Sequence, residues 1–470
     1  MSFQLRVGAA VVAALLGAAA EDRAQPALPP GTSQAVGEPD EVIRALVAEA
    51  LANNPDLLVA DESVTAAEAR PQQAGALPDP MVSAQYTNDG WAPTLGQQQM
   101  TTLAFMASQT LPWPGKRSLR TAIAHSDATQ ARESVARARL TMAAAVRRAF
   151  WGLALARETL GLLAEQREVW RNAEAVTRGR YVVGQGAQQD VLRAQVEITR
   201  YEQLRAEQDA ELAVRAAELN RLLNRPADAP APPTPPLVLR PRESDLTALW
   251  AEAEARSPEL RAAGAGRERE ELAGRLAQKD FRPDVTVQAA YMNRGGLDPM
   301  WQAGVGVNLP LQRGRRRAAV AEAAARGRGA ARQVEALRAH LRFRTQERVI
   351  QLRTAETLVR LYDGALVPQA RLAYEASIAS YQAGKAPFLT VLEALSSLYS
   401  DRASQLRVVA AHERIKASID EASLEATSEM PASSAAAMAA TAGAASGGAP
   451  MGTGATASPG ARAAMTPMGQ

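Results

Sequence analysis

One set of proline, glycine and tyrosine landmarks occurs twice in this chain, about 200 residues apart, and limits the folds open to it. Asn54-Pro55-Asp56-Leu57 recurs as Ser257-Pro258-Glu259-Leu260, and Leu111-Pro112 recurs as Leu309-Pro310. Further landmarks keep the same order, with Tyr181, Gly184 and Val191 matched by Tyr381, Gly384 and Val391. Helix-rich low complexity would imitate matches between alanines but not these proline and glycine positions. We therefore predict a two-fold internal repeat.

Each copy predicts the same series of elements. A helix at 40–76 or 244–279 precedes two strands, at 81–87 and 101–111 in the first copy and at 285–292 and 301–309 in the second. Long helices follow at 118–183 and 315–383, with Pro368 expected to kink the latter. Glycine turns then lead into returning helices at 188–223 and 388–423. The fold class is thus mainly α with a small β part, built from long antiparallel helices and β-hairpins.

The expected strands alternate between apolar and polar or small residues. Trp301, Val305 and Leu309 face one way, while Gln302 and Asn308 face the other. This period favours a strand between lipid and a wet lumen, although a soluble sandwich alternates too. Two hairpins cannot bury a face alone, and lipid requires closed sheets. We therefore expect several copies of the chain to complete one barrel.

Composition agrees with packed helices and excludes several functions. Aromatic residues make up only 4%, cysteine is absent, and 53 basic residues nearly balance 50 acidic ones. The charges are interspersed, which indicates solvated helix faces and no nucleic-acid partner. The sequence has no phosphate loop, catalytic triad spacing or zinc motif. His125, His340 and His412 are widely spaced and are expected to face solvent or the bundle. We expect neither an enzyme nor a bound cofactor or metal.

The ends and the middle of the chain differ from the repeats. Residues 1–20 combine Arg6, a short apolar run and small residues, as a secretory signal peptide does. The remaining protomer is expected at 21–425, with repeat one at 40–224, a proline-rich linker at 225–241 and repeat two at 242–425. Residues 426–470 form a low-complexity tail predicted to be disordered. Its five methionines suggest soft-metal capture, but compositional drift explains them as well.

Taken together, these residues resemble the TolC-like outer-membrane efflux proteins. The most specific pieces are Arg180-Tyr181-Val182-Val183-Gly184 with Asp190-Val191-Leu192, and Ser380-Tyr381-Gln382-Ala383-Gly384 with Val391-Leu392-Glu393-Ala394. The segment Gln109–Lys116 is similar to the heavy-metal efflux branch. The resemblance covers about residues 40 to 425.

This resemblance implies a homotrimer whose twelve-stranded β-barrel continues into a periplasmic α-helical barrel. Gly184 and Gly384 match the family's periplasmic tip, where a periplasmic adaptor of a proton-driven inner-membrane pump docks. Asp190 and Glu393 match acidic residues that narrow the pore, whereas Thr390 replaces a common acid. Each of these residues also has a simpler explanation. A turn between two helices requires glycine whether or not an adaptor docks there, and an acidic residue such as Asp190 is favourable at any helix N-terminus because of the helix dipole.

The predicted function is a passive efflux duct in the outer membrane for small molecules or metal ions. The outlet of a type I protein secretion system shares the fold and stays open as an alternative. A periplasmic coiled-coil adaptor is disfavoured by the two matching strand pairs. Arg313, Arg315, Arg316 and Arg317 follow the last strand, where they could contact lipid headgroups or begin a solvated helix.

Overall fold

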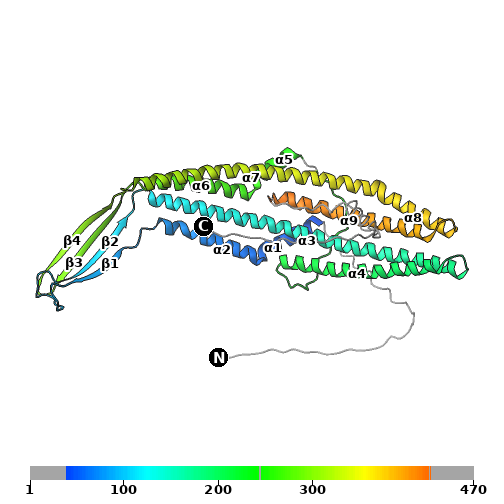
Figure 1. The fold of residues 1–470 in the computed structure, drawn as a ribbon, viewed down its shortest axis with the longest axis horizontal. Helices are drawn as coiled ribbons and strands as arrows, with labels where there is room; N and C mark the ends of the chain where they lie inside the picture. The colour runs from blue at the N-terminus through cyan, green and yellow to red at the C-terminus, as the bar shows by residue number, and fades with distance from the viewer. Residues whose placement is uncertain (1–38, 243–244, 423, 425–470) are drawn as a thin grey trace, which may run out of the picture.

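A computed structural model describes residues 39–242, 245–422 and 424. The predicted signal peptide at 1–20 and the predicted tail at 426–470 lie outside these residues. The described chain is an elongated rod with a β-sheet at one end and two helical turns at the other (Figure 1). Most of its length is helical, which confirms the expectation of a mainly α protein with a small β part.

The two hairpins form one antiparallel sheet in the order β1-β2-β3-β4. β1 (Met81–Thr87) pairs with β2 (Thr102–Leu111), and β3 (Asp284–Arg294) pairs with β4 (Leu297–Asn308). β2 also pairs with β3, so strands from both repeats share the sheet. The outer edges, β1 and β4, pair with no other strand among the described residues.

The strand register places apolar side chains on one face of this sheet. Residues directly opposite in an antiparallel pair point to the same side. Apolar pairs on this face include Ala84–Phe105, Phe105–Tyr291, Tyr291–Trp301 and Val287–Val305. The opposite face is mainly polar or small, with Ser83, Thr110, Thr286, Gln288, Gly304 and Gly306. Trp301 and Val305 are 80% and 69% exposed, so the apolar face is uncovered in the single chain.

Two long helical rows run from the sheet to the far turns. α3 (Lys116–Val182) is continuous, and its 67 residues span about 100 Å at 1.5 Å per residue. In the second repeat the row consists of α7 (Arg313–Leu361), a π-helical turn at Tyr362–Leu366, and α8 (Val367–Gln382). The break predicted from Pro368 therefore occurs, as a π turn.

The π turn accounts for a shift in the spacing of the repeats. At the start of the rows Gly115 matches Gly314, 199 residues on, whereas at the far end Tyr181 matches Tyr381, 200 residues on. A π turn closes hydrogen bonds five residues apart instead of four, so it accommodates one additional residue. The second repeat thus absorbs a one-residue insertion without changing which face of α8 is buried.

The helix that precedes each hairpin is divided in two, whereas the sequence predicted one helix in each place. α1 (Pro39–Asn53) ends at Asn54 and α2 (Pro55–Gly75) follows, while α5 (Leu246–Arg256) ends at Ser257 and α6 (Pro258–Lys279) follows. Asn54 accepts a hydrogen bond from the Asp56 backbone N–H at 2.9 Å, as an N-cap does. A proline at the first helical position suits a new helix start and disfavours a continuous helix.

The returning helices complete a layer of four helical rows. α4 (Gln188–Leu222) packs against α3, and α9 (Phe388–Glu421) packs against α3, α7 and α8. α2 and α6 pack against the sheet-side half of α3, on which α4 and α9 pack further along. The α1/α2/α4 row and the α7/α8 row thus form the two edges of the layer.

The middle of the rod is held by a hydrophobic cluster and by ion pairs. Phe150, Leu153 and Leu219 are fully buried where α1, α3 and the end of α4 meet. The last turn of α9 carries Asp420 and Glu421, whose charges oppose the helix dipole. Arginines offset them: Arg147 and Arg242 contact Asp420 at 2.6 and 2.8 Å, and Arg148 contacts Glu421 at 2.8 Å.

Candidate functional site at the helical tip

The far end of the rod is formed by two helix turns that share one geometry. Gly184 and Gly384 have φ of +72° and +74°, a conformation that favours glycine. Each donates its N–H to the carbonyl of Tyr181 or Tyr381, at 3.0 and 2.9 Å. The next residue bonds the carbonyl one position earlier, which makes both turns Schellman C-caps. The two predicted tip glycines thus occupy equivalent positions.

A hydrogen bond joins the two repeats just inside these turns. The hydroxyl of Tyr381, near the end of α8, donates to the Asp190 carboxylate in the first turn of α4 at 3.3 Å. Tyr381 is 4% exposed, and its ring packs on Phe388 with the centroids 5.2 Å apart. Burial and the Asp190 charge raise the pKa of Tyr381, so its hydroxyl stays a donor at neutral pH.

Arg180 forms a second link between the repeats. It comes from the last turn of α3 and donates to the carbonyls of Tyr381 and Gln382 across the tip. It also donates to Gln185 of its own turn at 3.1 Å. Its guanidinium carbon lies 4.8 Å from the centre of the Tyr381 ring, in cation–π contact. One arginine therefore binds both turns and covers the tyrosine that contacts Asp190.

Arg180 and Asp190 of the first repeat contact the second repeat, but their equivalents in the second repeat form no such contacts with the first among the described residues. The residues equivalent to Arg180 and Asp190 in the second repeat are Ser380 and Thr390, which supply neither the cation nor the carboxylate. Tyr181, the equivalent of Tyr381, is 46% exposed. Arg180, Asp190 and Tyr381 thus link the two repeats of one chain at the tip. Their equivalents Ser380, Thr390 and Tyr181 form no such links among the described residues.

The structure brings together three of the five predicted tip residues. Gly184, Gly384 and Asp190 lie in or beside the linked turns. Thr390 and Glu393 are exposed in the first turns of α9, and neither side chain has a hydrogen bond or ion pair within the described ranges. The sequence prediction did not assign Arg180 or Tyr381 to the site, although the recurrence of tyrosine at an offset of 200 was a signal for the latter.

An aromatic and aliphatic cluster supports the tip from within. It joins α3, α4, α8 and α9 through buried residues that include Trp170, Ala194, Tyr381, Phe388, Val391 and Tyr399. Burial raises the pKa of Tyr399 to about 12. Ala194 lies one helical turn after Asp190, and Val391 is buried in the same cluster, so the tip links border a packed core.

An open groove runs beside this cluster between α4 and α9. Its walls expose the apolar side chains of Leu192, Val196 and Leu389. Arg193, Glu197 and Arg200 line the same groove. A groove lined by both apolar and charged side chains suits an amphipathic helix.

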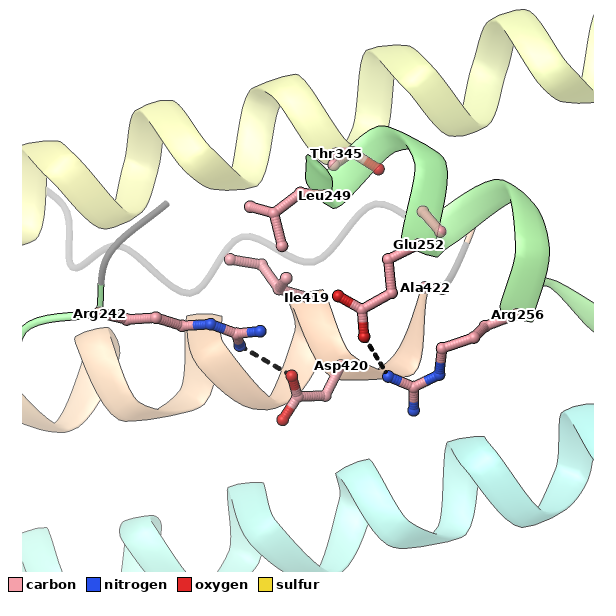
Figure 2. A pocket seen from close by; sticks show the side chains of 9 residues that line it. Arg242, Leu249, Glu252, Arg256, Thr345, Ile419, Asp420 and Ala422 are labelled. Carbon is pink, nitrogen blue, oxygen red and sulfur yellow. Dashed lines mark hydrogen bonds and ion pairs between the residues drawn. The ribbon is translucent and has the colours of Figure 1, made fainter. Parts of the chain in front are cut away.

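A pocket at the middle of the rod is too small for a ligand. It is lined by Arg242, Asp420 and Glu252 among others, where α5 meets the end of α9 (Figure 2). Its volume of about 10 Å³ admits one water molecule at most. Two dashed contacts cross it, Arg242 to Asp420 and Arg256 to Glu252. We therefore assign the pocket a structural role.

The described residues contain no cluster of His, Asp or Glu suited to hold a metal ion. His412 is fully buried and lies between Glu356 and Glu413, at 3.4 and 3.3 Å, whereas His125 and His340 are exposed. Within the described ranges, no helix is both long and apolar enough to cross a membrane.

Comparison with known proteins places this geometry in a family. The profile of the outer membrane efflux protein family matches residues 46–225 and 249–423, one segment in each repeat. The chain belongs to the outer membrane efflux protein family. It is therefore a passive channel of the outer membrane and not an enzyme. A search of curated proteins finds no match.

Solved outer-membrane channels share the fold. The structure resembles CusC, known from crystal structures of its folding and transmembrane channel formation, with a TM-score of 0.69 and 18% identity over 87% of this chain and 99% of that one. VceC of Vibrio cholerae gives a TM-score of 0.69 and 21% identity over 81% and 96% of the two chains. The open state of MtrE of Neisseria gonorrhoeae gives 0.63 and 18% over 81% and 88%.

Proposed function

We propose that this efflux channel is a homotrimer and forms the exit duct of a tripartite system. Three copies would join their sheets edge to edge into a twelve-stranded barrel, with the helical layers continuing as an α-helical barrel across the periplasm. The observation that carries this proposal is the exposed apolar face across all four strands, beside two unpaired edges. Lipid covers such a face, and closure of the barrel removes the edges.

The helical tip is the proposed gate and docking site. Gly184, Gly384 and Asp190 form or adjoin the linked turns, and Thr390 and Glu393 lie beside them in the first turns of α9. The links through Arg180 and Tyr381 hold one packing of the tip, and their release would allow a second, wider packing. A periplasmic adaptor supplies the release when it docks. The groove at Leu192 and Leu389 fits a helix of that adaptor.

The proposed cargo is small molecules or metal ions delivered by a proton-driven inner-membrane pump. The channel adds no energy, because cargo diffuses through its lumen once the pump has released it. The match to the outer membrane efflux protein family supports the efflux role, and the fold shared with CusC and VceC supports a channel.

Deletion of the chromosomal copy tests this function. Cells that lack the channel should retain pumped dyes, antibiotics or metal ions, and should recover export when the native chain is restored. A Leu192→Arg variant should reach the outer membrane but fail to capture the adaptor and to restore export. Loss of an exported protein with unchanged retention of small molecules would instead favour the secretion outlet.

A further inference from the structure

The second long row begins with cations that have no counterion among the described residues. Arg313, Arg315 and Arg317 are exposed in the first turns of α7, directly after β4. Within the described part of the chain, none of their guanidinium groups has a hydrogen bond or an ion pair. The first turn of α7 contains no acidic residue, and positive charge at a helix N-terminus opposes the helix dipole. An anion from outside the chain would stabilise this helix start.

The first repeat shows how the equivalent position is neutralised. Lys116 opens α3, 199 residues before Arg315, and is only 3% exposed. Its ammonium group contacts Asp284 at 2.9 Å and Asp280 at 3.5 Å, and donates to the Arg282 carbonyl at 3.1 Å. All three partners lie where α6 of the second repeat leads into β3. The cation of one repeat is thus bound by the helix-to-strand junction of the repeat that follows it.

Among the described residues, no further repeat follows the second one. The junction that would serve it belongs to the first repeat of another copy, where α2 leads into the unpaired strand β1. Asp79 lies in this junction, 203 residues before Arg282, which is the offset that also relates Pro80 to Pro283. Asp79 is exposed and has no ion pair or side-chain hydrogen bond within the described ranges.

Charge on the two edges of the helical layer is complementary over a greater length. α7 carries thirteen arginines and four glutamates, whereas α2 carries four acidic residues and one arginine. α6, which packs against α7 within the chain, is nearly neutral with five basic and four acidic residues. The positive excess of one edge therefore matches the negative excess of the other edge.

We propose that a second copy of the chain neutralises this cluster, with Asp79 of the next copy bound to Arg315 and flanked by Arg313 and Arg317. This inference rests on the proposed trimer and assigns the contact that orders its subunits head to tail. Repeated around the ring, the contact would set the start of one long row against the helix-to-strand junction of the next repeat, as Lys116 lies against Asp280 and Asp284 within the chain, with Asp79 at the position of Arg282. Opposite charges at the edges also speed the encounter of subunits and disfavour pairing of like edges.

Charge exchange tests the contact in the full-length protein. Asp79→Lys and Arg315→Glu each place like charges together, which should lower the fraction recovered as trimer from membranes about tenfold at low salt. The double variant Asp79→Lys/Arg315→Glu restores opposite charges and should recover most of the trimer. Asp89→Lys in the β1–β2 loop and Arg171→Glu on the inner helix α3 change exposed charges outside the two helical edges and should leave the trimer unaffected.

A crosslink gives a second readout that does not depend on stability. The chain has no cysteine, so Asp79→Cys/Arg315→Cys provides two thiols only. A short bismaleimide should then join chains into covalent dimers and trimers, whereas Asp89→Cys/Arg315→Cys should not crosslink.

Four results would overturn the proposal. An intact trimer in which Asp79→Cys/Arg315→Cys gives no crosslink would exclude the contact. The contact would also be excluded if the trimer fraction of the double variant fell as far as the two single effects combined. Loss of membrane insertion in Arg315→Glu with no effect of Asp79→Lys would assign the cluster to lipid phosphate. A native protein that is monomeric in membranes would contradict the proposed trimer itself, before any variant is made.

Discussion

Tyr381 and Asp190 lie 191 positions apart in the chain, yet the tyrosine hydroxyl donates to the carboxylate at 3.3 Å. Arg180 covers the same tyrosine ring and binds the adjacent carbonyls. The equivalent residues Ser380 and Thr390 cannot reproduce this arrangement. The two turns otherwise have matching sequences and geometry. The contacts that hold the tip together therefore run in one direction, from Arg180 and Asp190 of the first repeat to Tyr381 of the second repeat in the same chain.

Tyr381→Phe removes the hydroxyl and keeps the packing on Phe388. The change should weaken the tip by about 1 kcal/mol, the usual contribution of such a hydrogen bond, and so open the channel about fivefold more often. Cells with the variant should become more sensitive to large antibiotics that the outer membrane excludes. Tyr181→Phe, at the exposed equivalent, is the control and should change nothing. Equal sensitivity of the two variants would refute the role of the hydroxyl.

Arg180→Ser gives the first repeat the residue of the second. Loss of the carbonyl contacts and of the cation–π contact should cost about 2 kcal/mol. Spin labels at Gln185→Cys and Lys385→Cys should report a longer and broader distance between the turns. Arg178→Ser removes only an exposed pair with Glu174 and should leave the distance unchanged. A distance that is unaltered by Arg180→Ser would show that other contacts hold the turns.

Gly184→Ala and Gly384→Ala place a Cβ on left-handed backbone. Each should destabilise the tip by about 1 kcal/mol. A Cβ at 384 would also lie 3.4 Å from an Arg180 nitrogen, whereas one at 184 meets open space. Gly384→Ala should therefore be the more disruptive in protease accessibility of the tip. Gly179→Ala, inside α3, should instead stabilise slightly. If either Gly184→Ala or Gly384→Ala stabilised the protein, the left-handed backbone conformation of that glycine would be contradicted.

Deletion of Gly364 tests the π turn. Removal of one residue should convert the turn into regular α-helix and keep the buried face of α8, so that trimer yield stays near the native level. Deletion of Ala164, in the uninterrupted α3, rotates all later residues by about 100° and should expose Trp170. Comparable loss of trimer in both deletions would contradict the interpretation of the turn as an inserted residue.

The sequence predicted most of this fold because its signals are local or periodic. Prolines and glycines located the turns, and period-two alternation located the strands to within a few residues. The breaks at Asn54 and Ser257 were missed, although an N-cap followed by proline stood in the repeat itself. The site was harder, because the contacts of Arg180 and Tyr381 depend on how helices 200 residues apart cross. Glu393 and Thr390 were placed beside the tip by resemblance, but the helix directs them away from the links.

The buried charges near the middle of the rod should make stability depend on acid. Burial alone would raise the pKa of Glu413, but the hydrogen bond with His412 and the Lys416 charge outweigh it and hold the pKa below the ordinary 4.5. Since the folded pKa is depressed, the contribution is complete above about pH 4.5 and is lost as pH falls through the folded value. Thermal unfolding measured from pH 7 to pH 3 should show this loss as a falling unfolding temperature. The unfolding temperature of Glu413→Gln should depend less on pH over this range. An unchanged slope in the variant would exclude Glu413.

We propose a channel whose tip is held shut by contacts between the two repeats of each chain. Single-channel recording in planar lipid bilayers tests it most directly, with purified native protein and the Arg180→Ser/Tyr381→Phe double variant. We expect small, brief openings for the native protein, and larger, longer openings for the double variant. Equal conductance of the two proteins, or no conductance from either, would contradict it.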